Sequence, residues 1–125
     1  RQVLNFGHTV GHALEAATDY RLGHGRAVAF GMIAEARIGE RLGLTEPKTS
    51  ESLTDVLAEL VDRTALEVET STVLGFLSAD KKARDGRTRY VLLRRIGQAL
   101  DQGGWAREVD EDVVRTAVDE VISGW

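Results

Sequence analysis

All three histidines of the chain lie in its first fifth, at positions 8, 12 and 24. His8 and His12 are four residues apart, so in a helix their side chains would lie one turn apart on the same face. A neutral imidazole nitrogen is a strong, directional ligand for a borderline metal such as zinc. The spacing therefore predicts a divalent-metal site, which His24 could reach from a glycine-flanked connection.

Two further polar residues extend this face of the first predicted helix. At about 100° per residue, Arg1 and Asn5 fall within an arc of roughly 60° that includes the two helical histidines, if the helix reaches back to Arg1. The opposite face of the helix is apolar. A cation, an amide and imidazoles in one line suit a site for an oxyanion and a metal ion better than they suit a buried surface.

The histidine pair is weak evidence when taken alone, because most helical pairs at this spacing are surface or core histidines. Two or three protein ligands would also leave a metal short of a normal coordination set. A further ligand would then have to come from outside this chain. Glycines flank the histidines at positions 7, 11, 23 and 25, and missing side chains let backbone or ligand approach closely.

Helices must position these residues. The first is predicted over residues 4–17, which are rich in Ala, Leu and Val. The second is predicted over residues 26–42, and its broad apolar stripe indicates burial on more than one side. Apolar residues at helical spacing mark a third helix over residues 53–61, whose start the single proline, Pro47, would precede.

The second half of the chain adds two helices and a small β element. Helices are predicted over residues 71–84 and 109–122. Between them, Asp85-Gly86 is a turn signal, and residues 89–93 have the aromatic and β-branched character of a strand. Glycines further along the chain mark the boundaries of a second predicted short strand. The sequence therefore predicts a mainly α domain with one small β-hairpin.

The composition fits one compact domain. The chain has 125 residues, and its net charge of −4 argues against a general nucleic-acid binder. It has no cysteine, which excludes disulfides and thiolate metal sites and favours a reducing compartment. There is no apolar run of membrane-spanning length and no signal segment. We expect a cytoplasmic protein that contacts neither nucleic acid nor membrane.

Three motifs in order resemble one family. Residues 1–15, RQVLNFGHTVGHALE, closely resemble the RxxLNFGHTxGHAxE signature of 3-dehydroquinate synthases. HGRAV at 24–28 with GM at 31–32 resembles the family's next motif. DKK at 80–82, followed by Gly86, VLL at 91–93 and IG at 96–97, resembles a third. The agreement runs across almost the whole chain and implies the helical C-terminal domain of the dehydroquinate-synthase-like fold.

The resemblance implies a role for each histidine. His8 and His24 match the two histidine ligands of the catalytic divalent metal, usually zinc or cobalt. His12 matches an active-site histidine that is implicated in proton transfer and contacts substrate. The sequence departs from the family at Arg26, where a glutamate is usual. That exchange places a cation beside a metal ligand and puts in doubt how the ligand is oriented.

The resemblance also implies substrate contacts. Arg1 and Asn5 match residues that bind the anionic and polar groups of the substrate, and one lysine of the pair Lys81 and Lys82 matches another contact. Structural alternatives are a solvated terminus for Arg1, a helix cap for Asn5 and an exposed helix end for the lysines. Both lysines remain candidates.

The family converts 3-deoxy-D-arabino-heptulosonate 7-phosphate to 3-dehydroquinate and phosphate, in the shikimate pathway of aromatic amino-acid biosynthesis. It uses NAD, held mainly by an N-terminal α/β domain that also supplies a glutamate metal ligand. We find no glycine-rich turn for a pyrophosphate here, and the chain opens with Arg1. We therefore expect residues 1–125 to be the C-terminal metal- and substrate-binding domain, inactive alone and part of a homodimer in the full enzyme.

Two other interpretations remain. The chain could be a non-catalytic fragment or interaction module that keeps the fold. It could also belong to a related sugar-phosphate cyclase that closes other heptulose or hexose phosphates. The DKK motif at 80–82 favours dehydroquinate synthase over the related cyclases, and intact histidines favour a truncated or split enzyme over a diverged module.

Overall fold

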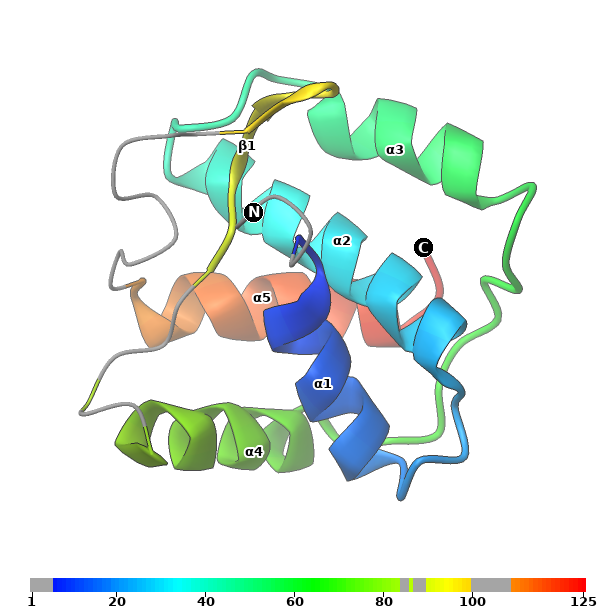
Figure 1. Ribbon diagram of the computed structural model, residues 1–125, viewed down its shortest axis with the longest axis vertical. Coiled ribbons are helices and arrows are strands. Elements are labelled where there is room, and N and C mark those ends of the chain that lie inside the picture. Colours follow the sequence, from blue (N-terminus) through cyan, green and yellow to red (C-terminus); the bar gives the residue numbers. More distant parts are fainter. Residues whose placement is uncertain (1–5, 84–85, 87–89, 100–108) are drawn as a thin grey trace.

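The computed structural model describes residues 6–83, 86, 90–99 and 109–125 (Figure 1). These residues form five helices and one two-stranded antiparallel hairpin. The prediction of a mainly α domain with a small hairpin is confirmed. The elements are α1 (His8–Ala17), α2 (His24–Arg41), α3 (Thr49–Leu57), α4 (Thr70–Ala83), β1 (Leu93–Arg95), β2 (Gln98–Ala99) and α5 (Glu111–Ile122).

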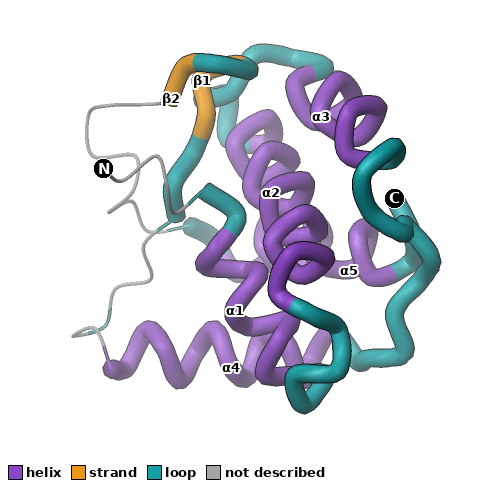
Figure 2. The backbone as a smooth tube through the Cα atoms, turned by 45° about the vertical axis from the view of Figure 1, so that its right-hand side comes forward, coloured by secondary structure: helices purple, strands orange, loops and turns teal. Residues whose placement is uncertain are grey.

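Helix α2 is the centre of the domain. It packs against α1, α3 and α5, and its far end contacts β1 (Figure 2). Its large apolar residues Phe30, Ile33 and Ile38 are all fully buried, as the broad apolar stripe predicted. A helix that is covered on several sides gains stability from apolar burial around its circumference, and it offers a fixed frame on which neighbouring helices are placed.

Close packing of α1 on α2 depends on glycine. A Cβ atom at Gly31 would overlap the carbonyl oxygen of Gly7 and lie 2.7 Å from the amide nitrogen of Gly11. At Gly11 itself, a Cβ would meet the Ala27 carbonyl oxygen at 3.1 Å. The two backbones therefore meet directly where α1 begins, and no larger residue at position 31 fits this crossing.

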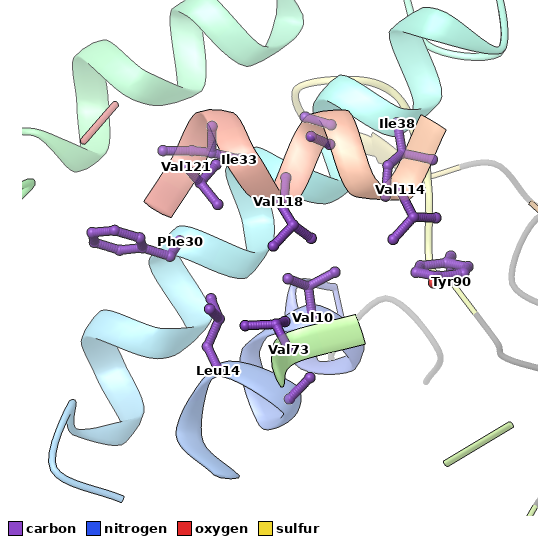
Figure 3. Close-up of a cluster of buried hydrophobic side chains, with 14 of the residues drawn as sticks. Val10, Leu14, Phe30, Ile33, Ile38, Val73, Tyr90, Val114, Val118 and Val121 are labelled. Atoms are coloured by element: carbon purple, nitrogen blue, oxygen red, sulfur yellow. The ribbon is translucent and has the colours of Figure 1, made fainter. Parts of the chain in front are cut away.

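The core continues from α2 into α4 and α5. Val114, Val118 and Val121 of α5 meet Val10 and Leu14 of α1, together with residues of α2 and α4, in one cluster (Figure 3). The C-terminal residue Trp125 also packs inward, with its ring edge-on to Phe30 at 5.4 Å between centres. This cluster holds α1, which carries two of the histidines, firmly against the rest of the domain.

The hairpin is tied to the connection between α2 and α3. The Thr45 hydroxyl donates to the carbonyl of Leu93, and the Glu46 N–H donates to the carbonyl of Arg94 at 2.7 Å. The observed strand begins at Leu93, so it shares only its first residue with the strand predicted at residues 89–93, of which residue 89 lies outside the described residues. Tyr90, Val91 and Leu92 precede the strand, and their side chains are buried in the core.

Two predicted helices differ from the structure. In the described residues the first begins at His8, because Phe6 and Gly7 form a turn and Gly7 has a left-handed φ of 85°. Residues 4 and 5 of the predicted helix lie outside the described residues. The third ends at Leu57, and two of its predicted apolar positions are exposed, Val56 at 57% and Leu60 at 72%. Helix α3 packs mainly on α2, so one narrow face of it is buried.

None of the described helices combines the length and the apolar character that crossing a membrane requires.

Candidate metal centre

The three histidines come together at the point where α1 crosses the start of α2. Ring centres are 5.2 Å apart for His8 and His12, 5.3 Å for His8 and His24, and 6.1 Å for His12 and His24. A metal about 2.1 Å from an imidazole nitrogen lies roughly 3.3 Å from that ring's centre. Each pair of rings is therefore close enough to share one ion, and the residues fit a divalent metal.

Each histidine reaches this point from a different backbone position. His8 is the first residue of α1, His12 follows one turn later, and His24 is the first residue of α2. Sequence analysis placed His24 in a loop, whereas the helix starts there, after Gly23 with a φ of 88°. The crossing of α1 and α2 therefore unites residues that are 16 positions apart in the chain.

A carboxylate with no predicted role, that of Glu15, lies beside two of the histidines, His12 and His24. Glu15 Oε1 lies 3.2 Å from Nδ1 of His24. Ligand atoms of His12, Glu15 and His24 all lie within 4.8 Å of one another. Glu15 is three residues after His12, on the same helical face, and this spacing was the signal available in the sequence. Glu15 can orient the His24 ring or serve as a ligand.

The cluster is open on one side. His8 is half-buried, His12 is exposed, and the His24 side chain is 60% exposed. Nδ1 of His8 lies 3.4 Å from the Phe6 carbonyl oxygen. A neutral ring protonated at Nδ1 would donate there and leave Nε2 as the metal-binding nitrogen. An ion held here stays accessible to a substrate and to ligands from outside the chain.

Arg26 points away from the histidines. Its Nε donates to the carbonyl of Asp62 and its Nη2 to the carbonyl of Thr64, both at 2.8 Å, and its guanidinium lies 5.3 Å from the centre of the Phe30 ring. The cation therefore anchors the connection between α3 and α4. Glu15 remains as the charged group beside His24, so the exchange at position 26 leaves a carboxylate next to this ring.

Replacing Arg26 with alanine is expected to lower the free energy of unfolding by about 1–2 kcal/mol, because two carbonyls lose a charged donor. Arg115→Ala is the matched control, since Arg115 forms only an exposed pair with Glu111 on the same helix among its described contacts, and should cost at most about 0.5 kcal/mol. Urea denaturation measures both variants. Equal losses would show that Arg26 is not an anchor.

The remaining predicted site residues are Arg1, Asn5, Lys81 and Lys82. Arg1 and Asn5 lie outside the described residues. Lys81 and Lys82 lie on the exposed last turn of α4. Lys81 lines a cavity of about 160 Å³, and within the described ranges α1 contributes nothing to its lining. The cavity is lined by Leu74, Leu77, Ser78, Lys81, Tyr90, Val109, Glu111 and Val114.

Comparison with known proteins identifies the family. The sequence model of the family described as 3-dehydroquinate synthase C-terminal matches residues 1–83. The chain belongs to this family, whose curated relatives are enzymes. A 3-dehydroquinate synthase of Acidithiobacillus ferrooxidans is 45% identical over 109 residues, covering 82% of this chain and 29% of the relative. One from Dehalococcoides mccartyi strain CBDB1 is 42% identical over 101 residues, covering 80% and 28%.

Solved structures agree with the fold. A 2-deoxy-scyllo-inosose synthase in complex with carbaglucose-6-phosphate, NAD+ and Co2+ superposes with a TM-score of 0.79 at 22% identity, over 97% of this chain and 34% of that one. The 2-epi-5-epi-valiolone synthase of Streptomyces hygroscopicus, with NAD+ and Zn2+ bound, gives 0.76 at 24% identity, over 94% and 32%. The chain thus spans about a third of the length of the proteins it matches.

Proposed function

We propose that this chain is the metal- and substrate-binding part of a 3-dehydroquinate synthase, which converts 3-deoxy-D-arabino-heptulosonate 7-phosphate to 3-dehydroquinate and phosphate. The observation that carries the proposal is the convergence of His8, His12 and His24, with ring centres 5.2 to 6.1 Å apart. The family match and the 42–45% identity to curated synthases support the reaction.

In this proposal His8 and His24 hold a divalent ion, zinc or cobalt, and Glu15 orients the His24 ring. When bound, such an ion acidifies a substrate hydroxyl and polarises a ketone. His12 is exposed beside both other rings. Its side chain can therefore take a proton from a bound substrate or return one.

Cationic and amide side chains would hold the ends of the substrate. Arg1, Asn5 and one of Lys81 and Lys82 would bind its carboxylate, hydroxyls and phosphate, because charge-assisted hydrogen bonds suit these groups. Fixing both ends keeps each reacting carbon near the metal through successive steps. Both lysines are on the exposed end of α4, where a phosphate can reach them.

NAD would be bound mainly by an N-terminal domain, which would also supply a further metal ligand. The solved relatives with NAD+ bound are about three times as long as the part that this chain matches. The complete enzyme would be a cytoplasmic homodimer. The 125-residue chain alone is expected to form no product.

The test is a fusion of this chain to the N-terminal two-thirds of the Acidithiobacillus ferrooxidans synthase, assayed with NAD+ and Co2+. We expect phosphate release and 3-dehydroquinate from the heptulosonate phosphate, with no product from the separate chain. A fusion carrying both His8→Ala and His24→Ala is the inactive control. Turnover of a hexose phosphate alone would assign a related cyclase, and a folded fusion inert towards all these substrates would favour a non-catalytic module.

A further inference from the structure

A buried carboxylate from α2 caps the start of α1. Glu35 is fully buried, with 0% exposure. Its Oε1 accepts from the Gly7 N–H and its Oε2 from the Val10 N–H, each at 3.0 Å. The first N–H groups of a helix have no partner within the helix. Since Gly7, the residue at the N-cap of α1, has no side chain, Glu35 takes over the role of the missing cap.

The cap joins the two halves of the histidine cluster. His8 lies between Gly7 and Val10, the two residues whose N–H groups Glu35 holds. His24 begins the same helix, α2, that carries Glu35. The glycine contacts bring α1 close to α2, and the two hydrogen bonds to Glu35 further restrain the rotation of the first turn of α1. His8 belongs to that turn, so the orientation of the turn affects where the His8 ring lies relative to the His24 ring.

Burying the carboxyl group of Glu35 in the core costs folding free energy. Burial raises its pKa to about 8, while hydrogen bonds from the Val10, Gly7 and Thr9 backbone act in the opposite direction. A buried carboxyl group contributes less to stability than an apolar side chain of similar size, unless its hydrogen bonds are needed to hold other groups in place. The cost indicates a role beyond filling the core.

We propose that Glu35 is a positioning residue, which holds the first turn of α1 so that His8 faces His24 at metal-binding distance. This inference rests on the proposed metal site. Glu35 would act through His8 and not by direct contact, because its side chain is fully buried and its two oxygens accept from backbone N–H groups of α1.

The same helix supplies a matched control. Glu40 of α2 caps α3 in a similar way, with Oε2 accepting from the Ser50 N–H at 2.6 Å and Oε1 from the Ser50 hydroxyl at 3.1 Å. Helix α3 carries no histidine. Glu35→Gln and Glu40→Gln therefore each weaken one carboxylate cap on a neighbouring helix, but only the first concerns the histidine cluster.

The experiment compares Co2+ binding by the unaltered chain and the two variants, followed by the visible absorption of the bound ion. Glu35→Gln should weaken Co2+ binding about ten-fold or more and change the absorption band, as expected when a group that orients a ligand is lost. Glu40→Gln should leave the Co2+ affinity and the absorption band unchanged, although both variants should be less stable than the unaltered chain. Unchanged affinity and absorption in Glu35→Gln would overturn the proposal.

A metal-free measurement separates this inference from the proposed function. The ring-proton NMR shifts of His8 depend on the neighbouring imidazoles, so they should change in Glu35→Gln and stay in Glu40→Gln. If the unaltered chain binds no Co2+ without the ligand from outside it, these shifts alone decide the role of Glu35, and the two-domain fusion tests the metal site separately. Should Glu35→Gln not fold, Glu35→Asp, which keeps the carboxyl group on a shorter side chain, gives the same comparison.

Discussion

Replacing Gly31 with alanine is expected to destabilise the domain by about 3 kcal/mol or more. The added Cβ would overlap the Gly7 carbonyl oxygen and lie 2.7 Å from the Gly11 nitrogen. Both are backbone atoms, so α1 as a whole would have to move away from α2. Overpacking of a dense interior costs about 1–3 kcal/mol when side chains can adjust, and here they cannot. Urea denaturation measures the loss.

Gly75→Ala is the control for this variant. Gly75 is an exposed residue within α4, and a Cβ there meets no atom within 4 Å. Alanine should leave the stability unchanged or raise it by up to about 1 kcal/mol, because alanine favours the helix. A Gly31→Ala protein with the denaturation midpoint of the unaltered chain would show that α1 and α2 do not meet backbone to backbone.

The second large effect is expected at the histidines. His8→Ala and His24→Ala should each weaken Co2+ or Zn2+ binding by about 100-fold or more, because each removes one of few protein ligands. His12→Ala should bind the ion with nearly unchanged affinity and, in the two-domain fusion, lose turnover. Isothermal titration with each metal and the phosphate-release assay measure the two effects separately.

Glu15→Gln, compared with the histidine variants, distinguishes the two possible ligand sets. If Glu15 only orients His24, the amide should weaken binding about ten-fold, since such partners contribute 10- to 100-fold. If His12, Glu15 and His24 hold the ion, as their ligand atoms within 4.8 Å would permit, then His12→Ala should be as damaging as His24→Ala. His8→Ala would then bind almost normally, and the proposed roles of His8 and His12 would be wrong.

Local sequence patterns were sufficient to find the helices. Apolar spacing placed α2, α4 and α5 to within two residues of their observed ends, because the helical period is a property of neighbouring residues. The pattern was less useful for α3, where Val56 and Leu60 are exposed. An apolar residue is buried only if another element covers it, and periodicity does not say where that element lies.

The first helix shows the same limit. A composition rich in Ala, Leu and Val extended the predicted helix back past Gly7, but the left-handed backbone of Gly7 interrupts it. The structure places Gly7 against α2, and this contact, rather than helix propensity, decides the conformation. The local sequence likewise did not predict that Arg26 is oriented towards Asp62 and Thr64, because these partners lie 36 and 38 residues away along the chain.

The residue types and their order establish which chemistry the domain can offer: imidazoles at helical spacing, no thiol, and an ordered set of motifs. Which groups meet depends on how the helices pack, since His24 joins His8 and His12, Glu15 reaches His24, and Glu35 holds the turn before His8. These contacts depend on how closely two helices approach and how each is rotated. Glycine contacts and the hydrogen bonds of a buried carboxyl group join α1 and α2 across sequence separations of up to 28 positions.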